Sequence, residues 1–334
     1  MKKEPLQPDP LGTRPPPLTG DPVPRFADEA LRERSEAALA TCLGIWVAND
    51  RQDMVIAQVR SYLGAWHLAD EKEACGGRRL SQYSQAGKSA TMRRLKKVLA
   101  KQRRTRGLAP SKYQVVIVTL RKRLTLNQLY RAILKKMGCP HWNQEKISVD
   151  TLLCRIEEHA ALIGMELLVI DEIQHLDNDT KDAEAVLHQL KVFVDEAYFP
   201  IVFVGDEDSL PFFERNQKLA ARLGDPLELR PLKPLENDDD ALAFQKLCHK
   251  FDLALVKADV FTRPAGLSKK LLLDGLMIAS GGHVGRVASL LQIAVPHAIW
   301  RGADAVEAFD LSHAVRSYAI KNNWVGFDPW SDRG

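Results

Sequence analysis

The sequence lacks the features that would assign it to a membrane, secreted or disulfide-rich class. No apolar run among the 334 residues reaches the roughly 18 to 20 needed for a membrane-spanning helix, and residues 1–17 contain no apolar stretch of the signal-peptide kind. We therefore expect no membrane association and a cytoplasmic location. The cysteines are far apart and form no CxxC pair, which argues against a zinc site or a disulfide framework: Cys42, Cys75, Cys139, Cys154 and Cys248.

Acidic residues are absent from a long internal window. Residues 74–144 contain no Asp or Glu but hold 18 Lys or Arg, so with a net charge of +4 the remainder of the chain carries −14. A concentrated positive field is what a polyanion-binding surface requires, because neutralising phosphates releases condensed counterions. A solvated basic face is the alternative, but the length of the window favours nucleic acid.

The order of patterns along the chain predicts several units. Residues 1–25 are rich in proline and predict a disordered arm, whereas residues 26–73 carry apolar positions at helical spacing and predict an N-terminal helical segment. Residues 74–234 predict an α/β nucleotide-binding core. Residues 235–322 predict a small helical lid domain, followed by a tail at 323–334.

The fold class follows from short β-branched runs that alternate with amphipathic helices. Three such runs are too short for buried helices and are separated by helical patterns: Tyr113–Leu120, Glu166–Ile170 and Pro200–Gly205. Such alternation predicts an α/β fold with a parallel sheet and helices on both of its faces. The segment Arg78–Ser81 is a poor strand by its composition.

A phosphate-binding loop is indicated by Gly87-Lys88-Ser89. In the pattern GxxxxGK[ST], backbone N–H groups cradle the phosphates, the lysine reaches the β and γ phosphates and the hydroxyl holds Mg²⁺. The first glycine of the pattern is replaced by Gln82, which predicts weaker nucleotide affinity or slow hydrolysis. The predicted ATP-binding residues of this loop are Gln82, Tyr83, Ser84, Gln85, Ala86, Gly87, Lys88, Ser89 and Ala90.

A second motif supports the first. Leu167–Ile170 is an apolar strand that ends in Asp171 and Glu172, which is the Walker B pattern. We expect Asp171 to hold Mg²⁺ and Glu172 to polarise the water that attacks the γ-phosphate. Alone, such a strand is more often one with a solvated end, but the order of the two motifs favours an ATP and Mg²⁺ site.

Three further positions resemble functional residues of AAA+ proteins. Asp206, after the strand at 201–205, lies where a polar sensor residue is usual, although an acid there adds repulsion toward a triphosphate. Arg286, in Gly281–Arg286, resembles the second sensor in the lid. Arg222 resembles the arginine that acts on the ATP of a neighbouring subunit, and Arg215 is its rival. For an isolated arginine, a surface salt bridge is the more common role.

The whole order of motifs is similar to the TniB/TnsC family of transposition regulators. The segments that carry the resemblance are "LYRAILKKMG", "VIDEIQHL", and "PIVFVG" followed by "LAARL". The resemblance implies an AAA+ ATPase that oligomerises on double-stranded DNA with ATP, as a ring or helical filament. It also implies recruitment or activation of a transposase at a target chosen by a partner protein.

The resemblance places DNA contacts at the end of the second strand and in the loop after it. Here that region contains Arg121, Lys122, Arg123 and Thr125, inside the acid-free window. Binding through phosphates with no reader motif predicts contacts that are independent of sequence and sensitive to salt. One helical face also carries basic side chains, which could equally be a solvated surface: Arg93, Lys97, Lys101 and Arg104.

Other functions stay open at this point. The altered phosphate loop is compatible with a DNA-bound scaffold that does not hydrolyse ATP, and the AAA+ motifs with another initiator-like protein, such as a replication loader or a signalling ATPase. The aromatic tail Trp324–Trp330 could dock a partner or pack back on its own domain.

Overall fold

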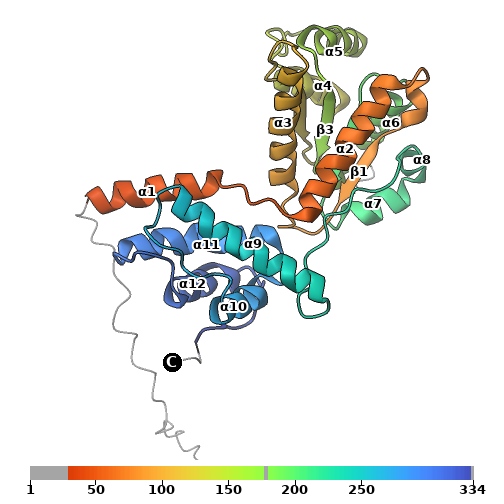
Figure 1. Cartoon of the computed structure of the whole chain (residues 1–334). Coiled ribbons are helices and arrows are strands. Elements are labelled where there is room, and N and C mark those ends of the chain that lie inside the picture. Colours follow the sequence, from red (N-terminus) through yellow and green to blue (C-terminus); the bar gives the residue numbers. More distant parts are fainter. Residues whose placement is uncertain (1–28, 177–179, 332–334) are drawn as a thin grey trace, which may run out of the picture.

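The computed structural model describes residues 29–176 and 180–331, and shows an α/β part joined to a helical part (Figure 1). The arm expected at residues 1–25 lies outside the described residues, as does the end of the tail from 332. The α/β part holds both nucleotide-binding motifs.

Four parallel strands form the sheet of the α/β part. They are β1 (Arg78–Ser81), β2 (Val115–Thr119), β3 (Leu167–Asp171) and β4 (Ile201–Gly205), in the order β1-β4-β3-β2. Because all pairs are parallel, the carboxyl ends of the strands meet at one edge. The predicted fold class is thus confirmed.

The low expectation for Arg78–Ser81 was wrong, since this segment is β1. It pairs with Val202–Gly205 along its whole length. Its two arginines are accommodated because each guanidinium lies over an aromatic ring, Arg78 at 4.6 Å from the Tyr62 ring centre and Arg79 at 5.2 Å from that of Phe213. Leu80 supplies the buried apolar side chain of the strand.

Helices cover both faces of the sheet. On one face α2 (Asp50–Leu68) and α3 (Lys88–Thr105) pack on side chains such as Leu167 and Val169, and on the other a larger cluster packs on Leu168 and Ile170. This alternation is the period of two expected for a strand buried on both sides. The helices of the second face are α4 (Leu126–Lys136), α5 (Val149–Ile163), α6 (Lys181–Asp195), α7 (Ser209–Arg215) and α8 (Gln217–Ala220). Two 3₁₀ turns complete this part, η1 (Lys72–Cys75) and η2 (Ile173–Leu176).

The outer edge of β1 is covered by the segment that follows α8. The N–H of Gly77 donates to the carbonyl of Arg222 at 3.0 Å, and the N–H of Leu227 donates to that of Arg79 at 2.8 Å. These bonds satisfy backbone groups that an open edge strand would expose. The segment then runs on into the helical part.

The helical part has its own apolar core. It contains α1 (Glu29–Gly44), α9 (Asp238–Lys257), α10 (Lys270–Ser280), α11 (Val284–Trp300), α12 (Ala308–Ala314) and a π turn, η3 (Val315–Ala319). Trp330 of the tail is buried in this core and donates from its indole nitrogen to the carbonyl of Leu271 at 3.3 Å. Up to this tryptophan, the tail packs back on the helical part.

The N-terminal helical segment divides between the two parts. Helix α1 lies along the helical part, whereas α2 lies on the sheet (Figure 1). The break between them falls at Asn49, whose side chain caps α2 by accepting the N–H of Gln52 at 3.0 Å. The chain therefore crosses between the parts twice, at residues 45–49 and at residues 230–237.

Arg51 ties the two crossings together. Its guanidinium donates to both carboxylate oxygens of Asp240 on α9, at 2.6 and 2.8 Å, and to the carbonyl of Arg230 at 2.6 Å. A bidentate arginine–carboxylate pair of this kind fixes orientation as well as distance. It anchors the first turn of α2 to the helical part.

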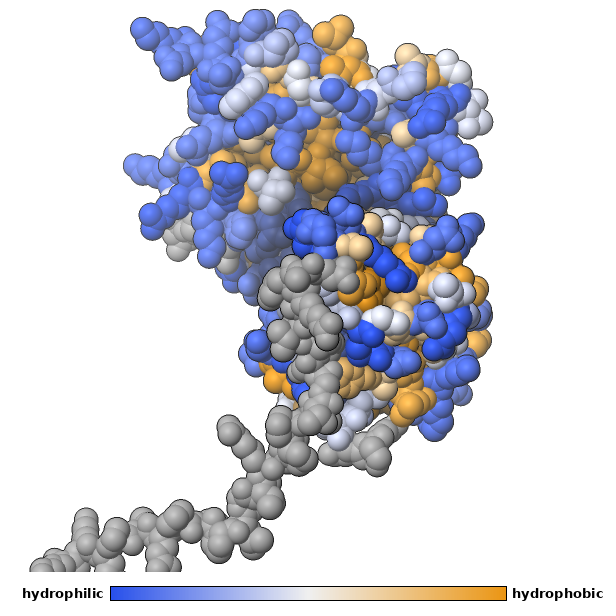
Figure 2. Space-filling view, turned by 90° about the vertical axis from the view of Figure 1, so that its left-hand side faces the viewer, coloured by the Kyte–Doolittle hydropathy of each residue, from blue (hydrophilic) through white to orange (hydrophobic). Residues whose placement is uncertain are grey.

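Figure 2 shows mostly hydrophilic surface over the α/β part on the face toward the viewer, and hydrophobic patches among hydrophilic ones on the helical part. Exposed aliphatic side chains of that part include Leu43, Leu242, Leu253, Leu271 and Ile278. Within residues 29–176 and 180–331, no helix has the length and apolar character needed to cross a membrane.

We predict that Gly282→Ala destabilises the junction of the two parts. Gly282 has a φ of +73°, and a Cβ there would lie 1.7 Å from the carbonyl oxygen of Leu232, in the second crossing. We expect the free energy of unfolding, measured by chemical denaturation, to fall by about 2 kcal/mol or more. Gly64→Ala is the control: it lies inside α2 with nothing within 4 Å of the added carbon. It should raise stability by about 0.5–1 kcal/mol, and equal effects of the two changes would contradict the prediction.

Candidate nucleotide site at the carboxyl edge of the sheet

The phosphate loop runs from the end of β1 to the start of α3. Its left-handed positions are Gln85, with a φ of 64°, and Gly87, with a φ of 91°. Gln82 is not among the residues with positive φ, so its side chain imposes no backbone strain. A Cβ at Gly87 would lie 2.8 Å from the amide nitrogen of Gln52, a buried side chain of α2. The left-handed backbone therefore favours glycine at this last position of the loop, and the buried Gln52 side chain would have to shift for any larger residue.

Lys88 folds back into the mouth of its own loop. Its ammonium donates to the carbonyl oxygens of Gln82 and, at 2.9 Å, Tyr83. Burial lowers the pKa of Lys88, and the carboxylates of Asp206, Glu207, Glu172 and Asp171, in decreasing order, raise it. Lys88 is thus a cation that interacts with four carboxylates.

The two carboxylates after β3 lie in different surroundings. Burial, and then the charge of Glu172, raise the pKa of Asp171, which favours a cation beside it. Glu172 has a φ of 61°, and its Oε2 accepts a hydrogen bond from the amide of Gln174 at 2.8 Å. His175 Nε2 lies 3.9 Å from the same oxygen. The Glu172 carboxylate is therefore positioned by a side chain two residues further along.

The turn after β4 directs acids toward the phosphate loop. Asp206 Oδ1 accepts the N–H of Asp208 at 3.1 Å, which fixes the turn, and the charge of Asp206 raises the pKa of Lys88. The next residue, Glu207, accepts the N–H of Ser84 through Oε2 at 2.9 Å. This contact joins the turn directly to the phosphate loop.

The lid meets the loop at the start of α11. The N–H of Gly285 donates to the carbonyl of Gln85 at 3.0 Å, and a Cβ at Gly285 would lie 2.3 Å from that oxygen. Arg286, one residue on, lies over the ring of Trp324 at 5.2 Å, so the tail helps to orient it. Burial lowers the pKa of Arg286, against the raising effect of Glu207.

His283 of the lid faces the loop beside Arg286. Its ring lies edge-on to that of Tyr83, with ring centres 6.1 Å apart. Burial and the charge of Arg286 lower the pKa of His283 from 6.5 to about 4. The imidazole is therefore neutral in the folded protein at pH 7.

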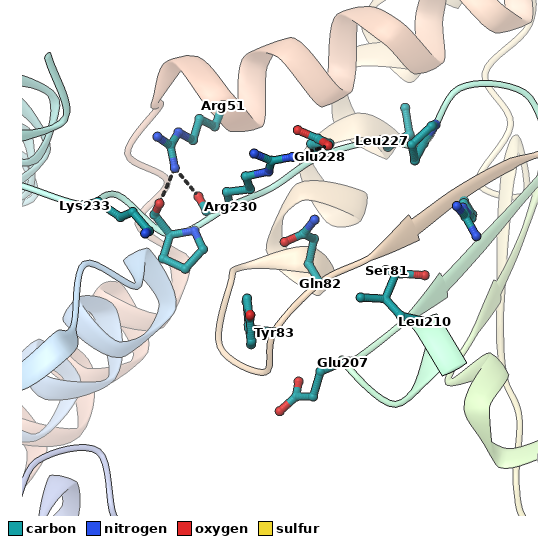
Figure 3. Close-up of a pocket in the computed structure, with 13 residues that line it drawn as sticks. Arg51, Ser81, Gln82, Tyr83, Glu207, Leu210, Leu227, Glu228, Arg230 and Lys233 are labelled. Atoms are coloured by element: carbon teal, nitrogen blue, oxygen red, sulfur yellow. Dashed lines mark hydrogen bonds and ion pairs between the residues drawn. The ribbon is translucent and has the colours of Figure 1, made fainter. Parts of the chain in front are cut away.

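A cavity of about 690 Å³ lies beside the phosphate loop (Figure 3). It is bounded by residues from β1 and the loop, from the turn after β4, from α2 and from the segment at 226–233. This volume is in the range of small-molecule sites. Its lining combines apolar side chains such as Leu210 and Leu227 with basic ones such as Arg51, Arg79 and Arg230.

Of the two candidate trans-acting arginines, Arg222 lies away from this edge. Arg222 is bonded through its carbonyl to Gly77, before β1, so it lies a strand's length of about 16 Å from Gln82. Its guanidinium is paired with Asp195 at the end of α6. Arg215 ends α7. Arg222 is thus on a different end of the sheet from the phosphate loop of its own chain.

The basic loop, residues 121–125, begins directly after Leu120. Arg121, Lys122 and Arg123 are exposed, and Arg123 has a φ of 59°. Thr125 differs, because its hydroxyl caps α4 by accepting the N–H of Gln128 at 3.2 Å. Leu120 itself is bound to the Walker B turn. Its N–H donates to the carbonyl of Asp171 at 2.8 Å, and its own carbonyl lies 3.0 Å from His175 Nδ1.

Several residues of this site were not singled out by the sequence. They are Gln52, Gln174, Glu207 and His283, whose contacts no local pattern reveals. Trp324, predicted only as part of the aromatic tail, reaches the site through Arg286. Glu207 carried a weak signal, because it follows a residue already identified at the end of β4. Ser89 is exposed at the start of α3, near the other predicted residues of the loop.

Solved structures share this fold at low sequence identity. The Aeropyrum pernix ORC1 protein, in complex with DNA, matches with a TM-score of 0.55 and 16% identity, over 81% of this chain and 66% of that one. The ORC2 protein of the same organism, in ADPNP–ADP complexes, matches with a TM-score of 0.59 and 16% identity, over 81% and 68%. The chain spans about two thirds of the length of these proteins. At this identity the likeness shows a shared fold.

The family follows from the sequence itself. The family model described as "Bacterial TniB protein" matches residues 49–233, which is more than half of the chain. The chain belongs to the TniB family of Walker-type AAA+ ATPases, which implies a role related to transposition, and the expected resemblance is confirmed. No curated protein matches the chain.

We predict that His283 makes the protein less stable in acid. Its folded pKa of about 4 is below the ordinary 6.5, so between these values the unfolded chain binds a proton that the folded one excludes. The contribution of His283 to the free energy of unfolding is therefore lost as the pH falls from 6.5 to 4. The free energy of unfolding of a His283→Gln variant, measured across this range, should fall less than that of the wild type. His67→Gln, at an exposed position, should follow the wild type, and parallel curves for all three would contradict the assignment.

Proposed function

We propose that this TniB-family protein is an ATP-dependent regulator of DNA transposition that assembles on double-stranded DNA. The observation that carries the proposal is that Lys88, Asp171 and the lid backbone at Gly285 meet at one phosphate loop in a chain of this family. As proposed, the protein recruits or activates a transposase at a target chosen by a partner protein. We place it in the cytoplasm, where its DNA would be.

Nucleotide binding is supported by the site and by the fold. The loop, the lid and the adjoining cavity offer N–H donors, a lysine, an arginine and apolar surface, as phosphates and a base require. The similar ORC2 protein was solved in ADPNP–ADP complexes. We propose that ATP binds through residues 82–90, with Asp206 and Arg286 near the terminal phosphate.

The acids of the Walker B turn suit a magnesium ion. Burial raises the pKa of Asp171, and a cation beside its carboxylate would offset that cost. We propose that Asp171 and the Ser89 hydroxyl would hold Mg²⁺, which would neutralise charge on the transferred phosphate. Glu172 would orient the attacking water once Gln174 releases its carboxylate.

The proposed assembly needs two copies of the chain for each active site. Because Arg222 lies at the end of β1 remote from its own phosphate loop, we propose that it acts on the nucleotide of a neighbour. In the single chain, the Arg222 guanidinium is paired with Asp195. Arg215 is the second candidate for this role. A ring or helical filament would supply such neighbours.

The proposed DNA contact is the basic loop. Arg121, Lys122 and Arg123 are exposed in a window without acids, as backbone recognition requires. The similar ORC1 protein was solved in complex with DNA. Thr125 can add at most a minor contact, because its hydroxyl already caps α4.

We predict that Lys88→Ala loses both nucleotide binding and assembly. Removing the only lysine of the loop should weaken ATP affinity by at least about tenfold, since a charge-assisted contact to phosphate is lost. Electron microscopy with linear duplex DNA, with and without ATP and Mg²⁺, should show ordered rings or filaments for the wild type with ATP only. Lys96→Ala, at an exposed position of the same helix, should behave as the wild type. Assembly that ignores nucleotide would contradict the proposal.

We predict that DNA binding depends on the basic loop. Replacing Arg121, Lys122 and Arg123 by Ala should weaken binding to duplex DNA at low salt. It should also reduce the slope of log K against log salt by up to about 2.7. The control replaces Arg93, Lys97 and Lys101 of α3, which removes the same charge from another exposed surface. Unchanged affinity for the loop variant, measured by fluorescence anisotropy, would exclude this loop.

One observation favours a second function, a DNA-bound scaffold that does not hydrolyse ATP. Both Lys88 and Glu172 are engaged by groups of their own chain. Single-turnover hydrolysis separates the two functions. Product formed by the wild type and lost in Glu172→Gln supports the ATPase, and no product with nucleotide bound supports the scaffold.

A further inference from the structure

We propose that Glu207 is a built-in competitor of the nucleotide, whose carboxylate takes a position at the phosphate loop that a phosphate must have. This inference rests on the nucleotide site proposed above and concerns its regulation. As proposed, the affinity of the site for nucleotide stays low until the Glu207 side chain is displaced.

The contact is direct. Glu207 Oε2 accepts the backbone N–H of Ser84 at 2.9 Å, across 123 positions of sequence. Ser84 is part of the loop whose N–H groups serve to bind phosphate oxygens. A carboxylate oxygen and a phosphate oxygen are the same kind of acceptor, so both cannot take this donor. Figure 3 shows Glu207 close to the loop that carries Gln82 and Tyr83.

The charges around Glu207 are those that a triphosphate would use. Its carboxylate raises the pKa of Lys88, of His283 and of Arg286, so it acts on the loop and on the lid at once. It also lines the cavity beside the loop. The charge of one acidic side chain thus acts on both the lysine and the arginine proposed to hold the phosphates.

The turn after β4 holds Glu207 in this position. Asp206 Oδ1 accepts the N–H of Asp208 at 3.1 Å, and the carbonyl of Asp206 accepts the N–H of Ser209 at 3.1 Å. The carbonyl of Glu207 accepts the N–H of Leu210, in the first turn of α7, at 3.2 Å. The backbone of Glu207 is therefore fixed on both sides, and only its side chain has to move.

The loop is closed on itself in the same state. Lys88 donates to the carbonyls of Gln82 and Tyr83, so its ammonium and the Ser84 N–H both have partners within the chain. A nucleotide must break these contacts and also meet the negative charge of Glu207. Because Glu207 is exposed, its side chain can leave the loop without disturbing the core.

The test measures affinities for ATP and for ADP, in the presence of Mg²⁺, by isothermal titration calorimetry on the full chain. Glu207→Gln keeps the shape and an acceptor oxygen for Ser84 while it removes the charge. We expect it to bind ATP about three- to tenfold more tightly than the wild type, with a smaller gain for ADP because ADP carries less charge. Glu207→Ala, which removes charge and acceptor together, should bind at least as tightly. Glu214→Gln, the same change at an exposed position near the other end of α7, should match the wild type.

The outcomes separate this inference from the nucleotide site itself. If Lys88→Ala weakens ATP binding but Glu207→Gln leaves it unchanged, the site stands and the competitor role is wrong. If the wild type binds no ATP and Glu207→Gln does, the competitor role is supported in its strongest form. If neither binds, the nucleotide site is wrong, and the competitor role falls with it.

Discussion

Parallel pairing of four strands is the constraint on which the site depends. Since all four strands run in one direction, the residues that follow each of them reach the same edge of the sheet. The phosphate loop follows β1, the Walker B acids end β3, and the turn of Asp206 and Glu207 follows β4. The basic loop follows β2 at that edge as well. Parallel strand pairing thus brings residues from separate stretches of sequence to one edge of the sheet.

The helical lid adds side chains to the edge of the sheet from the start of α11. Two crossings join the helical part to the sheet, and the Arg51–Asp240 pair fixes them to each other. This brings the start of α11 to the loop, where the absence of a side chain at Gly285 lets two backbones approach closely. His283 then lies against Tyr83 of the loop, with the charge of Arg286 beside it. The position of the lid is therefore set by a few backbone contacts and one ion pair.

The parts that sequence predicted are those with a local physical cause. Strands β2, β3 and β4 and the helices of the lid were predicted from their apolar periods. Strand β1 was missed because its arginines are stabilised by Tyr62 and Phe213, which are distant in sequence. The same reason applies to Glu207 and Trp324. A contact between loops, or between a tail and a helix, leaves no mark in the composition of either segment.

The tie between Leu120 and the Walker B turn gives the basic loop a mechanical partner. Leu120 is 1% exposed, and both of its backbone polar groups face that turn, the N–H toward Asp171 and the carbonyl toward His175. The basic loop starts at the very next residue. A force that displaces residues 121–123 is therefore transmitted to the turn that carries Glu172 through the main chain and two hydrogen bonds. Leu120 alone separates the basic loop from the Walker B turn.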